Sequence, residues 1–177
     1  MDMVSMEAQL GALQARVQEI ENKEEIRNLR YRYHQCVNDS QFDRVADLFA
    51  EDAVVEIGYL FRSVGREEIA TSFKAMQNDL SFLKQFIHNH IVDVNGDEAT
   101  GVSYFEAKYA ALDETSLVVA GKYSEEYIST VDGWLISRMV VDLYFTTPLE
   151  KGWAIDNPHF LGAGGVIEQR KVPRPGG

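Results

Sequence analysis

The second half of the chain alternates apolar and polar residues in four long runs, and this pattern limits the fold more than any other feature. The runs cover about residues 85–94, 98–111, 116–129 and 134–146. Between them stand Asn95-Gly96-Asp97, Asp113-Glu114 and Asp132-Gly133, which favour tight hairpin turns. Because helical patterns fill the first half, we predict an α+β domain whose strongly curved, mostly antiparallel sheet wraps over helices.

Two helical patterns of different phase precede these strands. The first is a narrow apolar stripe with spacings of three and four, typical of a helix that needs a partner; it consists of Met6, Leu10, Leu13, Val17 and Ile20. The apolar positions then change phase, and Asn22 followed by Glu25 resembles a capping box. We therefore predict two helices, or one with a kink. On the second, a polar row can face a cavity; it consists of Arg27, Tyr31, His34 and Asn38.

The middle of the chain predicts a short helix, a strand and another helix. Ser40 and Asp43 have capping-box spacing and precede a helix that should end near Glu51. Residues 53–60 then alternate as a half-buried strand, with Tyr59 on its inner face. Gly65 should open the next helix. We divide the chain into an N-terminal helix for subunit contact (1–22), an α+β domain (23–146) and an irregular tail (147–177), whose apolar residues 160–166 should cover a neighbour or a pocket mouth.

Composition and missing motifs exclude several function classes. The net charge of -11 and the pI of about 4.8 disfavour nucleic acid and an anionic membrane surface as partners. The single Cys36 and the lack of a long apolar run indicate a soluble, cytoplasmic protein. We find no phosphate loop, dinucleotide fingerprint or nucleophile elbow, so we expect no cofactor. His88 and His90 should share one strand face, but no third metal ligand accompanies them, so we predict no metal site.

Several ordered motifs resemble one family. They are EIRNLRYRYHQCVNDSQFDRVADLFAEDAVVEIG, GREEIA, NHIVDVNGDEATGVSYF and GKYSEEYISTVDGWLISR. Over about residues 23–146 the chain is similar to the SnoaL-like branch of the nuclear transport factor two-like superfamily. The resemblance implies a cone of bent sheet closed by helices around a deep apolar pocket. It also implies a homodimer or homotrimer and acid-base chemistry without a cofactor, as in the family's dehydratases, dehydrochlorinases, isomerases, cyclases and aromatic-dimer lyases.

The resemblance also points to a pair of catalytic positions. Dehydratase and dehydrochlorinase members pair an Asp at the end of the first long helix with a His on the first strand of the four. Without gaps, these positions fall on Asn38 and Gln85 of this chain. An amide cannot support an imidazole as a carboxylate does. Either the register slips, which makes Asp39 and His88 the pair, or the pocket uses other groups.

Other polar and aromatic residues complete the predicted site. Tyr59 and His34 join Asn38, Asp39 and His88 as catalytic candidates, because a phenol or an imidazole can move a proton or stabilise an oxyanion. The candidates for substrate binding are Tyr31, Tyr33, Gln85, Phe105 and Lys122.

We expect a lyase that removes water, formaldehyde or another small group from a small hydrophobic aromatic or cyclic substrate, such as a lignin-derived aromatic dimer. The alternatives are an isomerase or polyketide-type cyclase that uses a single carboxylate such as Asp39, and a non-catalytic binding or assembly module.

Overall fold

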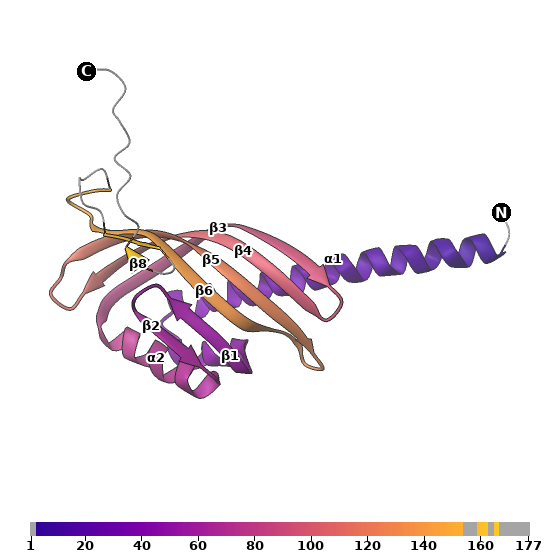
Figure 1. Cartoon of the computed structure of the whole chain (residues 1–177), viewed down its shortest axis with the longest axis horizontal. Coiled ribbons are helices and arrows are strands. Elements are labelled where there is room, and N and C mark those ends of the chain that lie inside the picture. Colours follow the sequence, from indigo (N-terminus) through magenta and orange to yellow (C-terminus); the bar gives the residue numbers. More distant parts are fainter. Residues whose placement is uncertain (1–2, 154–158, 163–164, 167–177) are drawn as a thin grey trace, which may run out of the picture.

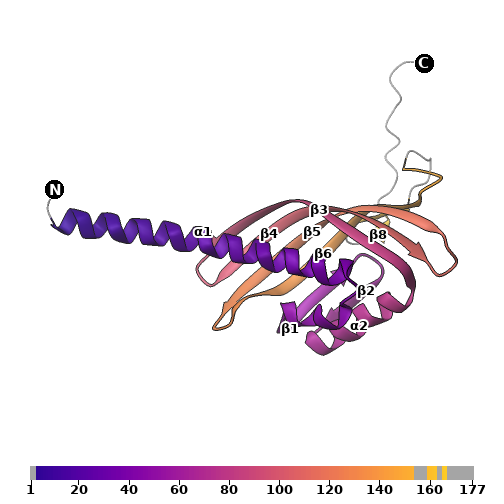
Figure 2. The ribbon, with the colours of Figure 1, turned by 180° about the vertical axis from the view of Figure 1, so that it is seen from behind.

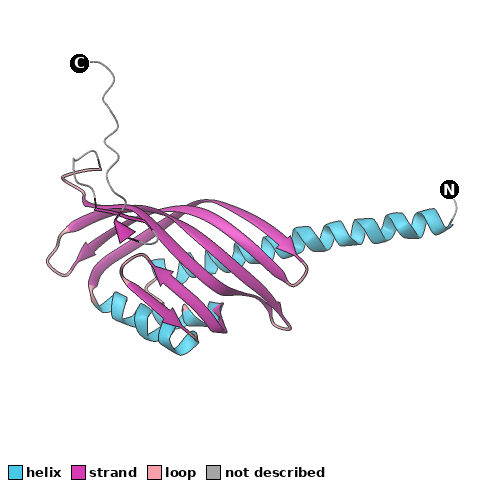
Figure 3. Cartoon of the chain, in the orientation of Figure 1, coloured by secondary structure: helices cyan, strands magenta, loops and turns pink. Residues whose placement is uncertain are grey.

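The computed structural model of this chain describes residues 3–153, 159–162 and 165–166. Figure 3 shows the helices, strands and loops of this part. The helices are α1 (Met3–Asn38) and α2 (Arg66–Asn78), and two short 3₁₀ turns span Phe42–Arg44 and Ala46–Leu48. The strands are β1 (Phe49–Ile57), β2 (Phe61–Val64), β3 (Leu80–Asn95), β4 (Glu98–Ala111), β5 (Ser116–Thr130), β6 (Gly133–Pro148), β7 (His159–Gly162) and β8 (Gly165–Val166).

One mixed sheet contains all of these strands. Its main order is β2-β1-β6-β5-β4-β3, with β1 and β6 parallel and the other neighbours in that order antiparallel. β7 pairs with β6 at Leu143 and Thr146, and β8 pairs with β7. The sheet curves strongly, and α1 and α2 lie on its concave side (Figure 1). This arrangement confirms the predicted α+β class with a mostly antiparallel sheet.

Helix α1 is one continuous helix, so the predicted break near Asn22 is wrong. The phase change at that position instead marks where the helix meets the sheet. The side chains described before Asn22 are exposed, whereas Ile26, Leu29 and Tyr33 are buried against the body. The N-terminal part of α1 therefore projects from the body, as Figure 2 shows from behind.

The segment after α1 differs from the predicted amphipathic helix. Ser40 adopts a left-handed conformation with a φ of 59°, and no side chain caps the turns that follow. Strand β1 then starts at Phe49, earlier than predicted, and β2 was not predicted. Phe42, Val45 and Phe49 are buried as expected, but in 3₁₀ turns and a strand.

Strand β3 contains a bulge that changes which residues face inward. Ile87 pairs with Phe105 whereas His90 pairs with Ser103, so β3 has one extra residue between these two pairs. The bulge moves His90 to the inner face, the face of Gln85, while His88 stays outside. The prediction that His88 and His90 share a face is therefore wrong, because strict alternation fails at this bulge.

Candidate active site

A mostly apolar cavity of about 180 Å³ opens on the concave side of the sheet. Apolar side chains from β1, α2 and strands β3–β6 form most of its wall. Its polar lining groups differ in exposure. Tyr33 and Tyr123 are buried and Gln85 is half-buried, and we call their part of the cavity the inner end; Tyr59 and Asp79 are exposed, and we call their part the open end. The remaining lining residues are Ile57, Leu60, Met76, Leu80, Leu83, Phe105, Ala107, Tyr109, Val119, Val141, Leu143 and Thr146.

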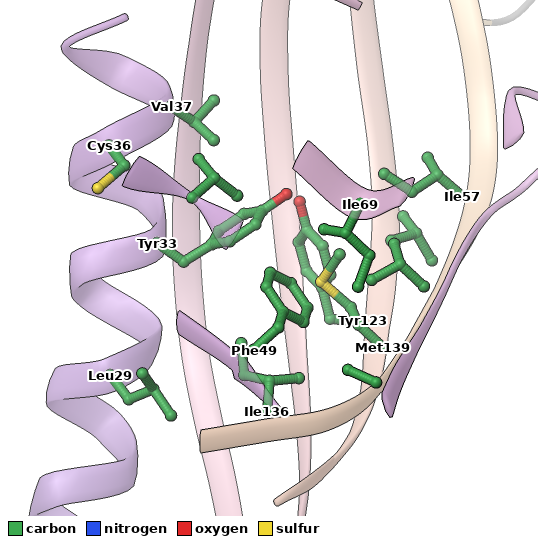
Figure 4. Close-up of a cluster of buried hydrophobic side chains, with 14 of the residues drawn as sticks. Leu29, Tyr33, Cys36, Val37, Phe49, Ile57, Ile69, Tyr123, Ile136 and Met139 are labelled. Atoms are coloured by element: carbon green, nitrogen blue, oxygen red, sulfur yellow. The ribbon is translucent and has the colours of Figure 1, made fainter. Parts of the chain in front are cut away.

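Two phenols and one amide form the inner end of this cavity. Tyr33 comes from α1 and Tyr123 from β5, and their oxygen atoms point toward one another (Figure 4). The two side chains are hydrogen-bonded, and the Tyr123 hydroxyl donates to Oε1 of Gln85 at 3.1 Å. Burial raises the pKa of both phenols. Both are therefore neutral hydrogen-bond donors near pH 7.

The side chain of Asn38 fixes the position of Gln85. Its Nδ2 donates to the main-chain oxygen of Gln85 at 2.8 Å, and its Oδ1 accepts from the Gln85 nitrogen at 2.7 Å. Lys84 in turn donates to the main-chain oxygen of Asn38. The two positions that the resemblance selected thus meet in space. Their contact is structural, since both polar atoms of the Asn38 amide are bonded to the backbone of β3.

A buried cation lies between the two phenol rings. The guanidinium carbon of Arg30 is 4.4 Å from the ring centre of Tyr33 and 3.6 Å from that of Tyr123. Its Nη1 donates to Oε1 of Glu125 at 2.9 Å, and both side chains are fully buried. Cation–π contact and the ion pair together hold the guanidinium in place. Arg30 therefore orients both rings of the cavity end.

Hydrogen bonds continue from Glu125 to one histidine, His90, and a second histidine, His34, packs against the two phenol rings. Tyr127 donates to Oε2 of Glu125 at 2.8 Å, and its oxygen lies 3.1 Å from Nε2 of His90. His34 packs edge-on against Tyr33 and Tyr123, and neither of its ring nitrogens has a hydrogen-bond partner among the described residues. Burial lowers the pKa of His34 to about 2 and that of His90 to about 4. Both imidazoles are neutral near pH 7.

The structure brings some predicted site residues together and separates others. Tyr33, Tyr59, Gln85 and Phe105 line the cavity, and His34 and Asn38 lie directly behind its inner end. The four other candidates lie outside it: Tyr31, Asp39, His88 and Lys122.

Each of these four has a simple geometric reason for its position. Tyr31 is 47% exposed on α1, and Asp39 follows the last residue of that helix and is exposed. His88 lies 3.7 Å from Glu106 on the outer face of the sheet. Lys122 alternates with the inward Tyr123 and pairs with Asp142 at 3.3 Å.

Sequence reasoning missed several residues of the site. Tyr123, Glu125 and Tyr127 follow each other at every second position of β5 and all point inward. A glutamate that stands between two tyrosines on the inner face of a strand indicates a buried charge, and the sequence pattern showed this. Arg30 and His34 are four residues apart on the buried face of α1, and this spacing indicated where the cationic partner of the buried glutamate could lie. Asp79, which ends α2, carried no such signal.

Two absences concern metal and membrane. Among the described residues, no three His, Cys, Asp or Glu side chains come close enough to hold a metal ion. No described helix is both long and apolar enough to cross a bilayer.

The fold has relatives among solved structures. A candidate aromatic ring hydroxylase from Novosphingobium aromaticivorans is 28% identical with a TM-score of 0.69, over 75% of this chain and 96% of that one. A candidate scytalone dehydratase from the same organism is 18% identical with a TM-score of 0.69, over 88% and 99%. A hexachlorocyclohexane dehydrochlorinase from Novosphingobium barchaimii is 18% identical with a TM-score of 0.65, over 84% and 99%. The last two support the fold alone.

Sequence comparisons identify the family. An uncharacterized protein of Mycobacterium tuberculosis is 28% identical over 127 residues, which are 70% of this chain and 86% of the relative. The model of the SnoaL-like domain matches residues 18–140, more than half of the chain. This chain therefore belongs to the SnoaL-like domain family.

Proposed function

We propose that this protein is a cofactor-independent lyase that acts on a small hydrophobic aromatic or cyclic molecule in the cavity. The observation that carries the proposal is an apolar cavity that ends on two neutral, hydrogen-bonded phenols. Such a cavity binds a ring by burying it and binds one substrate oxygen by hydrogen bonds. Membership of the SnoaL-like domain family supports this class of reaction.

The inner end of the cavity would stabilise negative charge on the substrate. Elimination beside a ring carbonyl builds negative charge on the carbonyl oxygen, because a base removes the proton on the adjacent carbon and an enolate forms before the leaving group departs. A substrate oxygen that displaces the Gln85 oxygen from Tyr123 would accept a hydrogen bond from that phenol as the charge develops, while Tyr33 donates to Tyr123, in a site with little water. The buried guanidinium of Arg30 beneath both rings would strengthen this effect.

The open end would supply the groups that move protons. Asp79 is the one carboxylate among the described residues that line the cavity, and we assign it the role of base. Tyr59, also at this end, would donate a proton to the leaving group. Asp39, the base of the slipped-register hypothesis, lies outside the cavity and has no role in this proposal.

Cavity size favours a substrate with a single ring. A dry protein cavity of about 150 Å³ accommodates benzene, and the cavity here is about 180 Å³. A single substituted ring fits this volume. The second ring of a lignin-derived aromatic dimer would have to lie beyond the open end, near Tyr59 and Leu60.

Two other functions remain as proposals. An isomerase or polyketide-type cyclase would use the same oxygen-binding end, with Asp79 returning the proton to the substrate. A non-catalytic binding module is favoured by one specific observation: Asn38 and Gln85 carry amides where family enzymes carry a carboxylate and an imidazole. Ligand binding without turnover would select this module.

Ultraviolet assays on a panel of hydroxylated single-ring substrates, without added metal or nucleotide, test the proposal. We expect turnover that falls about 10²–10³-fold in Tyr123→Phe, because one oxyanion donor is lost. Tyr104→Phe is the matched control, since Tyr104 lies on the outer face and is 40% exposed. Ligand binding without turnover of any substrate in wild type would refute the enzyme hypothesis.

A further inference from the structure

The N-terminal part of α1 leaves the body with an uncovered apolar stripe. We propose that residues 3–21, here called the stalk, pair with the stalk of a second copy of this chain as a parallel coiled coil. The stripe side chains Met3, Met6, Leu10, Leu13, Val17 and Ile20 are each 52–80% exposed. An exposed apolar row of this kind is most readily buried against the identical row of a second copy.

The spacing of the stripe is that of a coiled-coil seam. Met3, Leu10 and Val17 recur every seven residues, and Met6, Leu13 and Ile20 do the same three residues later. They therefore occupy the a and d positions of consecutive heptads. Outside these positions the described side chains of the stalk are polar or small. The stalk thus has a seam wide enough for a partner helix and too narrow to pack on a sheet.

Charges beside the seam favour a parallel partner. Gln9 precedes the a residue Leu10 and Arg16 precedes the a residue Val17, and Lys23 continues this row one heptad further. The residues that follow the d residues are Glu7, Gln14 and Glu21. In a parallel pair these two rows face each other, so Arg16 of one copy meets Glu21 of the other. In an antiparallel pair each of these rows faces the same row of the other helix. Arg16 then has no carboxylate opposite it across the seam.

The body leaves the seam free for a second copy. At about 100° per residue, the buried positions Ile26, Leu29 and Tyr33 lie roughly half a turn around α1 from the seam. The sheet therefore packs on the side of α1 opposite the stripe. Asn22, which accepts a hydrogen bond from Trp134 at 3.4 Å, marks where the body begins. Two bodies can sit at the same end of a parallel pair without covering either seam.

The stalk also needs a partner for its own stability. Its 19 residues extend about 28 Å at about 1.5 Å per residue. Most of the stability of helices in proteins comes from tertiary packing of an apolar face, and every described side chain of the stalk is exposed. A second stalk supplies the missing burial.

Sedimentation of the full chain tests the association. We expect an oligomer for wild type and a monomer for Leu13→Asp, which places a charge in the seam. Gln18→Asp, at an outward position of the same helix, is the control and should sediment like wild type. A monomeric wild type, or an oligomer that survives Leu13→Asp, would overturn the proposal.

Cysteine cross-linking tests the orientation. In a parallel pair Met6 lies beside Met6 of the second copy, so Met6→Cys should form a covalent dimer on oxidation. Cys36 is buried, and wild type should form none. In an antiparallel pair a positions face d positions, so Met6 lies near Val17 instead. A mixture of Met6→Cys and Val17→Cys chains that cross-links to each other, with no product from Met6→Cys alone, would refute the parallel arrangement.

Discussion

At the scale of single residues, replacing Arg30 should lower the free energy of unfolding more than replacing any other residue of the site, because its charge is fully buried. Arg30→Met leaves the Glu125 carboxylate buried without its cation and removes the support of both phenol rings. Breaking a buried ion pair in this way costs about 3–5 kcal/mol. We expect a loss of that order in the free energy of unfolding measured in urea. Arg32→Met, an exposed neighbour on α1, should change it by less than about 0.5 kcal/mol.

His34 predicts how stability depends on pH. Burial, followed by the charges of Arg30 and His90, lowers its pKa from 6.5 to about 2. Below about pH 6.5 the unfolded chain binds a proton that the folded chain does not bind. The free energy of unfolding should therefore fall with decreasing pH, by up to about 1.4 kcal/mol per pH unit for this residue. Urea unfolding between pH 6.5 and pH 4 should give a shallower dependence of the free energy of unfolding on pH for His34→Leu than for wild type, and an equal dependence would contradict this prediction.

At the scale of elements, the sequence predicted regular structure well and irregularities poorly. The β3–β6 strands and α2 follow from alternation, turn residues and apolar spacing. The bulge in β3 does not, because one extra residue leaves no compositional mark, and it placed His90 on the face opposite to that of His88. The same limit applies to α1, where a change of stripe phase was interpreted as a break. It marks the point at which the helix gains a sheet on its opposite side.

The site could be predicted only in part for the same reason. Tyr33, Gln85 and Phe105 lie on regular stretches, and their inward positions follow from spacing. Glu125 and Arg30 meet across 95 positions of the chain, so only the folded sheet brings them together. The sequence shows Arg30 and Glu125 each at an inward position of an apolar pattern, but it does not show that they pair with one another.

The contact between the end of α1 and strand β3 depends on one amide. Asn38→Asp keeps the acceptor for the Gln85 nitrogen but places a carboxylate against the Gln85 main-chain oxygen, where Nδ2 donated before. We expect a loss of about 1–3 kcal/mol in the free energy of unfolding. Asp39→Asn, the adjacent exposed residue, should have almost no effect. Equal stability of Asn38→Asp and wild type would mean that this amide does not hold β3.

At the scale of the whole molecule, the stalk and the cavity occupy different parts of the chain, so their functions should be separable. Leu13→Asp alters only the seam, and Ala107→Leu fills part of the cavity, at a cost of about 1–3 kcal/mol. A ligand at 100 times its Kd stabilises the folded state by about 2.7 kcal/mol.

Thermal unfolding with and without a single-ring phenol such as 4-methylphenol measures this stabilisation in each variant, and sedimentation measures assembly. We expect Leu13→Asp to lose assembly and keep the stabilisation by ligand. Ala107→Leu should keep assembly and lose that stabilisation. If Leu13→Asp lost both properties while still folded, the cavity would depend on the second copy. If Ala107→Leu lost both while still folded, the subunit contact would have to lie at the sheet rather than along the stalk.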